Sequence, residues 1–489
     1  MEKAIIDPYI NGDSIKTTSS ADADDQSQIL VFPSPGQGHM SPMIQFSKSV
    51  ASKGVRVTLV TTTSSSNSIQ AQEISFKVEL ISDGSEHVDK KSETIDEYLE
   101  RFRRVTTQTL ANLIINLKSR FSTSDASESE LVLNPIKLLV YDSSLPWLFD
   151  IAQQHGIAGA PFFTQSCAVT AIYHHFHQGA FTIDPSSTTI KQLPSMPPLG
   201  IKDVPSFLCD QGRSFPALFN ISRDQFSNLS EAKWLLWNTF DKLEHEVLEW
   251  MTSNQSWPIM TVGPTIPSMF FDKRFEDDKD YSFNLFNPNV DACMKWLDSK
   301  EIGSVVYVSF GSYASPNKKQ MEELAWGLKN SNYNVLWVVK QSEKEKLPSN
   351  VAEEMLEKGL VVTWCPQLQV LAHKAVGCFV THCGWNSILE ALSLGVPMVA
   401  MPQWSDQATN AKFIEDVWKT GVRVKVDEEL GVATKEEIAL CIGKIMEEEK
   451  GMEIRKASLK WKKLTKEAVS EGGSSYKNID ELVAKLKLI

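Results

Sequence analysis

The sequence predicts an α/β protein made of two doubly wound domains. Three observations support this prediction. The chain has 489 residues, which is too many for a single hydrophobic core. Short apolar strands alternate with helices, and this alternation is typical of parallel β-α-β units in a sheet covered on both faces. The alternation stops at 265–290, a stretch rich in Pro, Asp, Phe and Asn, and then restarts, which indicates a second domain of the same kind.

The first half of the chain supplies the elements of one parallel sheet. Its strands are short apolar runs such as QILVFP, VRVTLV and IKLLVY, and the last predicted helix of this run should end at Gly156. Strands are predicted at 28–33, 55–60, 76–81, 136–141, 158–163 and 234–238, and helices from near Ser41, at 94–118 and at 146–155.

The second half repeats the pattern, beginning with SVVYVS and VLWVV. Strands are predicted at 304–309, 335–339, 359–363, 377–381 and 396–401, and helices at 319–329, 367–373, 386–394, 406–419, 436–449, 453–471 and 475–488. Ligands of such sheets bind beyond the carboxyl ends of the strands, so the turns after the strands are the places to search for function. We expect a disordered tail at 1–27, a first domain at 28–264, a linker at 265–290, a second domain at 291–473 and a C-terminal helix at 474–489.

The composition argues against several classes of partner. The net charge is -12 and no long run of Lys or Arg occurs, so nucleic acid and anionic membranes are not expected partners. No apolar stretch approaches the roughly 20 residues that span a membrane, and the first residues are too polar for a secretory signal. Seven scattered cysteines are typical of reduced thiols. We therefore expect a cytoplasmic globular protein, with a monomer as the default state.

The turn at 381–390 is the most informative junction between a strand and a helix. Gly384 allows the backbone to turn tightly or to approach a ligand. The first amides of the helix, near Asn386 and Ser387, lack partners within the helix, and together with the helix dipole they attract an anion such as a phosphate. The side chains of His382 and Ser387 are further hydrogen-bond donors for such an anion.

Two plainer interpretations of this turn also exist. Ser387 and Glu390 form a Ser-x-x-Glu capping box, a pattern that begins many helices without any ligand. Cys378, Cys383 and His382 suggest a zinc site, but the segment has no CxxC pair and no second cluster, so a metal is not expected.

The wider sequence favours the functional interpretation. The 44 residues from Trp364 to Gln407 combine WCPQ, HCGWNS, Glu, Pro and DQ at fixed offsets. This segment resembles the signature box of plant family-1 UDP-glycosyltransferases. The segments PSPGQGHMSP, YDSSLPW, FFTQSC, NTFDKLE, VGPTIPS, VYVSFGS and EGGSS agree with the same family, so the resemblance covers nearly everything after residue 27. It is closest to the subgroup that glucosylates small carboxylates, triterpenes and steroids.

The resemblance implies the GT-B fold, in which two Rossmann-like domains face each other across a cleft. The C-terminal domain then holds the donor, the N-terminal domain holds most of the acceptor, and the last helix returns to the N-terminal domain. The matched positions imply uracil and ribose contacts from Trp364, Cys365, Gln367 and Glu390, diphosphate contacts from Ser312, His382, Gly384, Asn386 and Ser387, and sugar contacts from Thr164, Trp385, Asp406 and Gln407. Gln407 is usual in members of this family that use glucose, so the resemblance implies hexosyl transfer with UDP-glucose as the donor. Ile388 replaces the usual Thr and should point into the helix packing.

The reaction also needs a base that activates the acceptor oxygen. His39 is the candidate, because it ends the loop PSPGQGH after the first strand and an imidazole with a pKa of about 6.5 accepts protons near neutral pH. Asp142 ends another strand and can orient His39, and the family pairs these two positions. Direct attack on the anomeric carbon inverts its configuration, which gives a β-glucoside. No metal or other cofactor is expected, because helix amides and His382 stabilise the leaving diphosphate.

Several alternative functions fit the sequence less well. The turn at 36–41 lacks the third glycine of a dinucleotide-binding motif and the GK[ST] of a P-loop, which argues against a nicotinamide dehydrogenase. A non-catalytic sugar-nucleotide-binding protein would have lost His39 or Asp142, and both are present. The acceptor stays open: a steroid, triterpene or phenolic hydroxyl is favoured, and a small carboxylic acid that gives a glucose ester is the alternative. In AIYHHFHQG, at 171–179, the histidines fit a pocket wall or a partly exposed helix better than a metal site.

Overall fold

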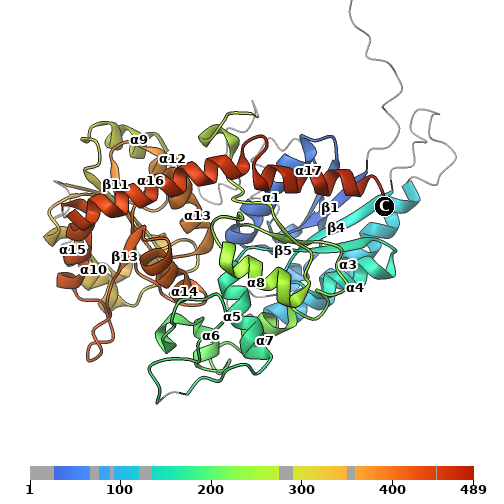
Figure 1. Cartoon of the computed structure of the whole chain (residues 1–489), viewed down its shortest axis with the longest axis horizontal. Helices are drawn as coiled ribbons and strands as arrows, with labels where there is room; N and C mark the ends of the chain where they lie inside the picture. The colour runs from blue at the N-terminus through green and yellow to red at the C-terminus, as the bar shows by residue number, and fades with distance from the viewer. Residues whose placement is uncertain are drawn as a thin grey trace, which may run out of the picture.

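The computed structural model describes residues 27–65, 76–88, 93–120, 135–184, 186–274, 290–349, 358–447 and 449–489. The tail predicted at 1–27 lies outside the described residues except for Ser27, as does most of the linker predicted at 265–290. Two parallel sheets lie side by side, each flanked by helices, and the helical C-terminal segment runs across both (Figure 1). No helix within the described ranges is both long and apolar enough to cross a membrane.

The first sheet has seven parallel strands in the order β3-β2-β1-β4-β5-β6-β7. The order reverses between β1 and β4, so a crevice opens at the carboxyl ends of these two strands. The strands are β1 (Gln28–Phe32), β2 (Arg56–Thr62), β3 (Lys77–Ile81), β4 (Ile136–Asp142), β5 (Ala158–Phe163), β6 (Leu235–Trp237) and β7 (Ile259–Thr261). The helices with it are α1 (Gln37–Ala51), α3 (Ile95–Arg120), α4 (Trp147–Gln154), α5 (Cys167–His177), α6 (Ser206–Cys209), α7 (Pro216–Asp224) and α8 (His245–Gln255).

The second sheet has six parallel strands in the order β10-β9-β8-β11-β12-β13, and its order reverses between β8 and β11. The strands are β8 (Val305–Ser309), β9 (Asn334–Val338), β10 (Gly359–Val362), β11 (Val376–Thr381), β12 (Met398–Ala400) and β13 (Gly421–Arg423). The helices are α9 (Val290–Asp298), α10 (Lys318–Asn330), α12 (Gln367–Ala372), α13 (Trp385–Leu394), α14 (Gln407–Lys412), α15 (Lys435–Met446), α16 (Glu449–Val469) and α17 (Ser474–Leu486). The prediction of two doubly wound α/β domains is confirmed, although β7 and β13, three residues each, were not predicted.

Helix α1 begins earlier than the sequence suggested. The prediction placed its start near Ser41, but the helix starts at Gln37. The carbonyl of Gly36 accepts hydrogen bonds from the amides of His39 and Met40, both at 2.9 Å, and these bonds close the first turn. His39 therefore lies within the first turn of a helix, where its backbone is fixed, rather than at the end of a loop.

Helix α17 packs against the first sheet, although it follows the second sheet in the chain. Its residues Ile479, Leu482, Val483 and Leu486 are buried in one cluster with apolar residues of α1, β1 and β2. The hydroxyl of Ser475 also donates to the carbonyl of Gly263 at 2.6 Å. The end of the chain is therefore part of the core of the first half.

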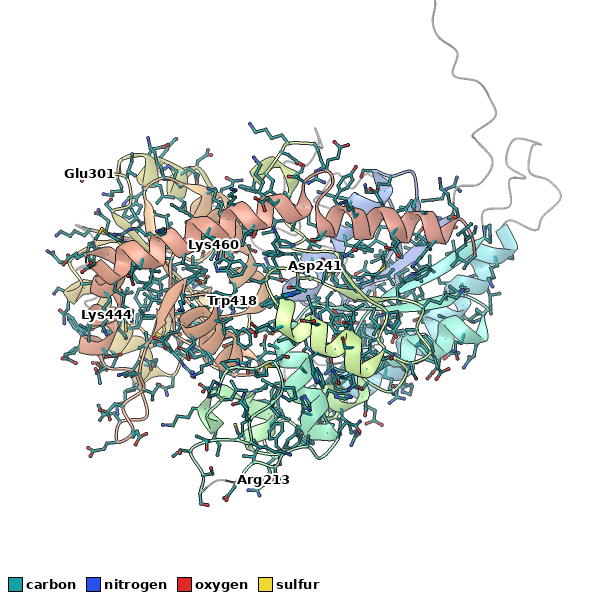
Figure 2. The ribbon with its side chains drawn as sticks, in the orientation of Figure 1. Arg213, Asp241, Glu301, Trp418, Lys444 and Lys460 are labelled. Atoms are coloured by element: carbon teal, nitrogen blue, oxygen red, sulfur yellow. The ribbon has the colours of Figure 1, made fainter. Side chains whose placement is uncertain are left out.

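The turn after β6 joins the two halves. The indole of Trp385 donates to the carbonyl of Asn238 at 2.8 Å, and the indole of Trp418 donates to the carbonyl of Leu243 at 3.1 Å. Figure 2 shows Trp418 and Asp241 on the two sides of this junction. Both tryptophans are buried, and buried carbonyls require a partner, so these bonds fix how the halves meet.

Replacement of Leu482 by alanine should destabilise the protein, because this side chain of α17 is fully buried against the first half. Loss of a buried leucine side chain costs about 2–5 kcal/mol of unfolding free energy. The matched control is Leu488→Ala, just beyond the same helix, where the side chain is 84% exposed and the effect should stay within about 0.5 kcal/mol. Urea unfolding followed by tryptophan fluorescence measures both variants. Equal effects of the two substitutions would contradict the packing of α17.

Candidate active site

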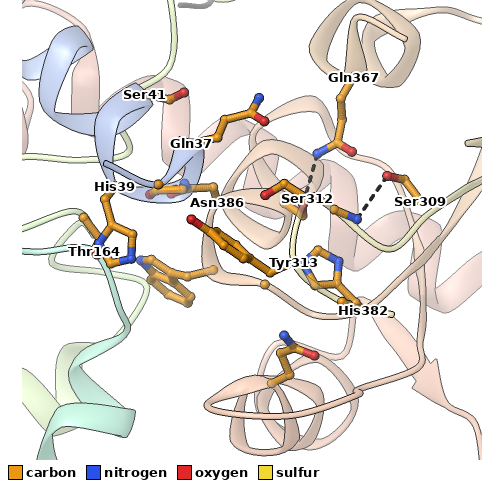
Figure 3. Close-up of a pocket in the computed structure, with 18 of the residues that line it drawn as sticks. Gln37, His39, Ser41, Thr164, Ser309, Ser312, Tyr313, Gln367, His382 and Asn386 are labelled. Atoms are coloured by element: carbon orange, nitrogen blue, oxygen red, sulfur yellow. Dashed lines mark hydrogen bonds between the residues drawn. The ribbon is translucent and has the colours of Figure 1, made fainter. Parts of the chain in front are cut away.

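A cleft of about 680 Å³ lies between the carboxyl ends of the two sheets. Its volume falls in the range of small-molecule sites, roughly 300–1,000 Å³. Figure 3 shows His39 and Thr164 from the first half on one side, and Ser309, Gln367 and His382 from the second half on the other. The predicted site residues that line this cleft are His39, Thr164, Ser312, Trp364, Cys365, Gln367, His382, Gly384, Trp385, Asn386, Ser387, Glu390, Asp406 and Gln407.

Asp142 lies behind His39 and is fully buried. The Nδ1 atom of His39 lies 2.7 Å from Oδ2 of Asp142 and 3.0 Å from the hydroxyl of Thr164. The other carboxylate oxygen of Asp142 accepts hydrogen bonds from the amide and hydroxyl of Ser144. The carboxylate is therefore held on both sides, and the Nδ1 proton of His39 points at it, which leaves Nε2 as the nitrogen that can accept a proton.

The two groups shift each other's pKa in opposite directions. Burial alone would lower the pKa of His39, but the charge of Asp142 and the hydrogen bond to it raise this pKa above its ordinary value. Burial opposes ionisation of Asp142, yet His39 and the bonds from Ser144 lower its pKa. The Asp142 contribution to stability is thus lost as pH falls through its folded pKa. The His39 contribution is present below about pH 6.5 and is lost as pH rises through its raised folded pKa.

The turn between β11 and α13 presents backbone amides to the cleft. Helix α13 starts at Trp385, and the first bond within it runs from the amide of Ile388 to the carbonyl of Gly384 at 3.1 Å. The amides of Trp385, Asn386 and Ser387 therefore have no acceptor inside the helix. Such a helix start is suited to bind an anion.

The predicted capping box at Ser387 and Glu390 is wrong. Ser387 is the third residue of the helix rather than its cap, because the helix begins two residues earlier at Trp385. The hydroxyl of Ser387 accepts a hydrogen bond from Nε2 of Gln367 at 3.0 Å, and Glu390 accepts from the same nitrogen at 2.7 Å. Tyr307 in turn donates to the side-chain oxygen of Gln367 at 3.1 Å. Gln367 thus orients Ser387 and Glu390 within the cleft.

His382 is enclosed by two glycines. A Cβ atom at Gly311 or Gly384 would lie 2.8 or 2.5 Å from its ring, so no larger residue fits at either position without movement. Gly311 also has a φ of +67°, which favours glycine. Burial lowers the pKa of His382 to about 4, so its ring is neutral near pH 7. Its Nδ1 is buried and has no hydrogen-bond partner among the described residues.

The side chains of Trp385 and Asn386 donate hydrogen bonds to backbone carbonyls of the first half. The indole of Trp385 donates to the carbonyl of Asn238. The side-chain amide of Asn386 donates to the carbonyl of Gly38 at 2.6 Å, and its side-chain oxygen lies 3.4 Å from the side-chain nitrogen of Asn238. Their backbone amides, together with the second hydrogen of the Asn386 side-chain amide, are the groups that these two residues can offer an anion.

The remaining predicted residues lie at the two ends of the cleft. Trp364 follows β10 and is half-buried, and the side chain of Cys365 contacts the hydroxyl of Tyr307 at 3.3 Å. The side-chain oxygen of Gln407 accepts from the amides of Gln403 and Trp404, which leaves its NH₂ group for a ligand. Asp406 accepts from Asn410 at 2.8 Å, and the side chain of Ser312 lines the wall between these ends.

Two residues of the site were not singled out from the sequence. Asn238 belongs to the segment NTFDKLE, and its place at the end of a strand was a usable signal. Tyr313 gave no signal: it projects from the second half into the middle of the cleft, and its hydroxyl lies 2.7 Å from where a Cβ of Gly36 would be (Figure 3). Tyr313 can lie this close to the first half only because Gly36 has no side chain.

The histidines at 171–179 lie away from the described cleft. His174 and His175 contact Trp257 and Trp250, with ring centroids 5.0 and 4.5 Å apart. His177 contacts the hydroxyl of Ser222 at 3.0 Å. These contacts favour the interpretation of 171–179 as a partly exposed helix over its interpretation as a wall of the pocket.

Comparison with known proteins extends over nearly the whole chain. Residues 27–457 match the family described as UDP-glucoronosyl and UDP-glucosyl transferase. The chain is 49% identical to mogroside I-E synthase of Siraitia grosvenorii and to UDP-glycosyltransferase 74E2 of Arabidopsis thaliana, and each alignment covers 94% of this chain and 98% of the relative. It is similar to the crystal structure of Os79 from O. sativa in complex with UDP, with 37% identity, a TM-score of 0.83, and coverage of 94% of this chain and 100% of that chain. A second crystal structure of Os79, with U2F and trichothecene, has a TM-score of 0.81, 36% identity and the same coverage.

Replacement of Asp142 by asparagine should lower the pKa of His39. The substitution keeps the shape of the side chain but removes the negative charge that offsets the burial of the imidazole. NMR titration of the nine histidines measures this shift, with the His39 signal assigned by its loss in His39→Gln. Asp416→Asn, a surface change beside Lys412, is the control and should leave the His39 titration as it is. A pKa unchanged by Asp142→Asn would refute the assigned pairing.

Proposed function

Because the chain belongs to the UDP-glucoronosyl and UDP-glucosyl transferase family, we propose that it is an inverting glucosyltransferase that moves glucose from UDP-glucose to a small apolar acceptor. The family makes it a glycosyltransferase that uses a UDP sugar and acts on small molecules. One observation carries the finer proposal. A single cleft holds an imidazole paired with a carboxylate on one wall and the free amides of a helix on the other.

The second half supplies groups suited to each part of UDP-glucose. Trp364 offers a planar ring for the uracil, and Glu390 offers acceptors for the ribose hydroxyls. The first amides of α13 and neutral His382 meet the diphosphate, where negative charge develops as the bond breaks, so no metal ion is required. Asp406 and the free NH₂ group of Gln407 meet the sugar hydroxyls. We accordingly assign the donor to the second half and the acceptor mainly to the first.

The steps of the glucose transfer follow from the position of His39 in the cleft. Its Nε2 takes the proton of an acceptor hydroxyl, and the oxygen attacks the anomeric carbon from the face opposite the leaving group. The bond from that carbon to the UDP oxygen breaks, and UDP leaves with the electron pair. Asp142 stabilises the imidazolium that forms. Attack from the opposite face converts the α-linked donor into a β-glucoside.

The charges around the cleft favour a neutral acceptor. Apolar residues of the first half contribute to its lining, namely Ile95, Leu99, Phe207, Leu218 and Phe270. Among the described lining residues, the one Lys or Arg is Lys340, which donates to the carbonyls of Ser312 and Ala314 on the donor side. The carboxylates of Asp142 and Asp406 both act on His39, and Asp142 carries the firmer negative charge, because burial raises the pKa of Asp406 whereas His39 lowers that of Asp142. A carboxylate acceptor would meet this negative charge, so a steroid, triterpene or phenolic hydroxyl is favoured over a glucose ester.

We further propose that the enzyme works in the cytoplasm as a monomer. All seven cysteines are free thiols, which fits a reducing compartment. One chain supplies both walls of the cleft.

Replacement of His39 by alanine should lower kcat about 10²- to 10⁴-fold, because this removes the general base. The affinity for UDP should stay within about twofold, since the donor contacts belong to the second half. His245→Ala is the matched control, because that side chain is 74% exposed on α8 and should be silent. Steady-state kinetics and UDP calorimetry measure both effects. Full turnover in His39→Ala would disprove the role of this residue.

Incubation with UDP-glucose and a panel of acceptors tests the substrate class. We expect mass spectrometry to show the gain of one hexose on apolar alcohols or phenols of steroid or triterpene size, and little gain on carboxylic acids. Parallel reactions with UDP-galactose test the preference for glucose. Hexose transfer to acids alone would support the ester-forming alternative, and transfer to no acceptor would support a sugar-nucleotide-binding protein.

A further inference from the structure

Helix α1 contains a proline that leaves one carbonyl of the helix without its regular partner. In an α-helix, the carbonyl of residue 38 accepts from the amide of residue 42. Residue 42 is Pro42, which has no amide hydrogen. The carbonyl of Gly38 is therefore open to another donor, and the side-chain amide of Asn386 takes this place at 2.6 Å.

Proline near the start of a helix is often neutral, because the first four amides have no partner in any case. This explanation does not apply to Pro42, which is the sixth residue of α1. At this position the helix gives up a hydrogen bond that it would otherwise make. The freed carbonyl belongs to the residue immediately before His39, and the donor that reaches it comes from the helix whose amides face the cleft.

From these contacts we propose that Pro42 is a positioning residue: by freeing the carbonyl of Gly38 for Asn386, it fixes the distance between His39 and the donor-binding start of α13. This inference rests on the proposed roles of His39 and of α13. Asn386 is held from its other side as well, because its side-chain oxygen lies 3.4 Å from the side-chain nitrogen of Asn238. The bond to Gly38 thus links the α1 wall to the α13 wall beside the base.

The hydrogen bond between Asn386 and Gly38 should affect the rate of glucose transfer more than the binding of UDP. Glycosyl transfer needs the acceptor oxygen, held at Nε2 of His39, to lie close to the anomeric carbon, and a shift of about 1 Å between reacting groups costs as much as 10²-fold in rate. UDP is proposed to bind to the second half alone. A change that loosens α1 from α13 therefore alters kcat and leaves UDP affinity in place.

The variant Pro42→Ala restores an amide hydrogen that competes for the carbonyl of Gly38, so the bond from Asn386 to this carbonyl should weaken. Alanine is also the better helix former, so the variant should be at least as stable to heat as the wild type. We expect kcat to fall about 10- to 100-fold, with the dissociation constant of UDP within about twofold of the wild-type value. Weaker UDP binding, lower thermal stability or an unchanged kcat would each overturn the proposal.

A double-mutant cycle with Asn386→Ala shows whether Pro42 acts through that residue. In the Asn386→Ala background, Pro42→Ala should have no further effect on kcat, whereas two multiplying effects would overturn the inference. Ser47→Ala is the matched control in the same helix: it removes the bond from the hydroxyl of Ser47 to the carbonyl of Met43 and should leave kcat unchanged. The wild-type enzyme is assayed in parallel. If it transfers no glucose from UDP-glucose, the proposed function has failed, whereas normal wild-type turnover with no effect of Pro42→Ala rejects this inference alone.

Discussion

The hydrogen bonds from the indoles of Trp385 and Trp418 to the turn after β6 determine how the two halves meet. Each half alone has a crevice where its strand order reverses, and neither crevice holds a complete set of reacting groups. The two bonds end on carbonyls of one short turn, at Asn238 and Leu243, so they hold the two halves together beside the cleft. The crevices thereby face each other, and His39 stands opposite the start of α13.

The cleft contains two histidines whose surroundings give them opposite properties. His39 lies beside the buried carboxylate of Asp142, which raises its pKa and makes it a good proton acceptor. His382 is buried between glycines without a carboxylate to offset the burial, so its pKa falls to about 4 and it stays neutral. A neutral ring suits a donor to an anion, and a basic ring suits a proton acceptor. Histidine can thus serve as the proton acceptor at one position and as a neutral donor to an anion at the other, because only His39 has a carboxylate beside it.

The sequence was sufficient to predict the two sheets and the residues that line the cleft. The two sheets follow from local features, namely the alternation of apolar strands with helices, and the anion-binding turn at 381–390 follows from its place between a strand and a helix. The other predicted residues of the cleft follow from the resemblance to the family. The features that could not be predicted depend on partners far away in the chain. The strands β7 and β13 are too short to show a period, and α1 starts at Gln37 because of bonds that only the folded turn reveals. Asn386 was assigned to the diphosphate by resemblance, whereas its side chain reaches Gly38, 348 positions away.

Helix α17 gives the chain a second crossing between the halves. The polypeptide passes once from the first half to the second between β7 and β8, and it passes back between α16 and α17. Two covalent connections resist separation of the halves more strongly than one. The halves should accordingly stay paired while substrates enter and leave the cleft.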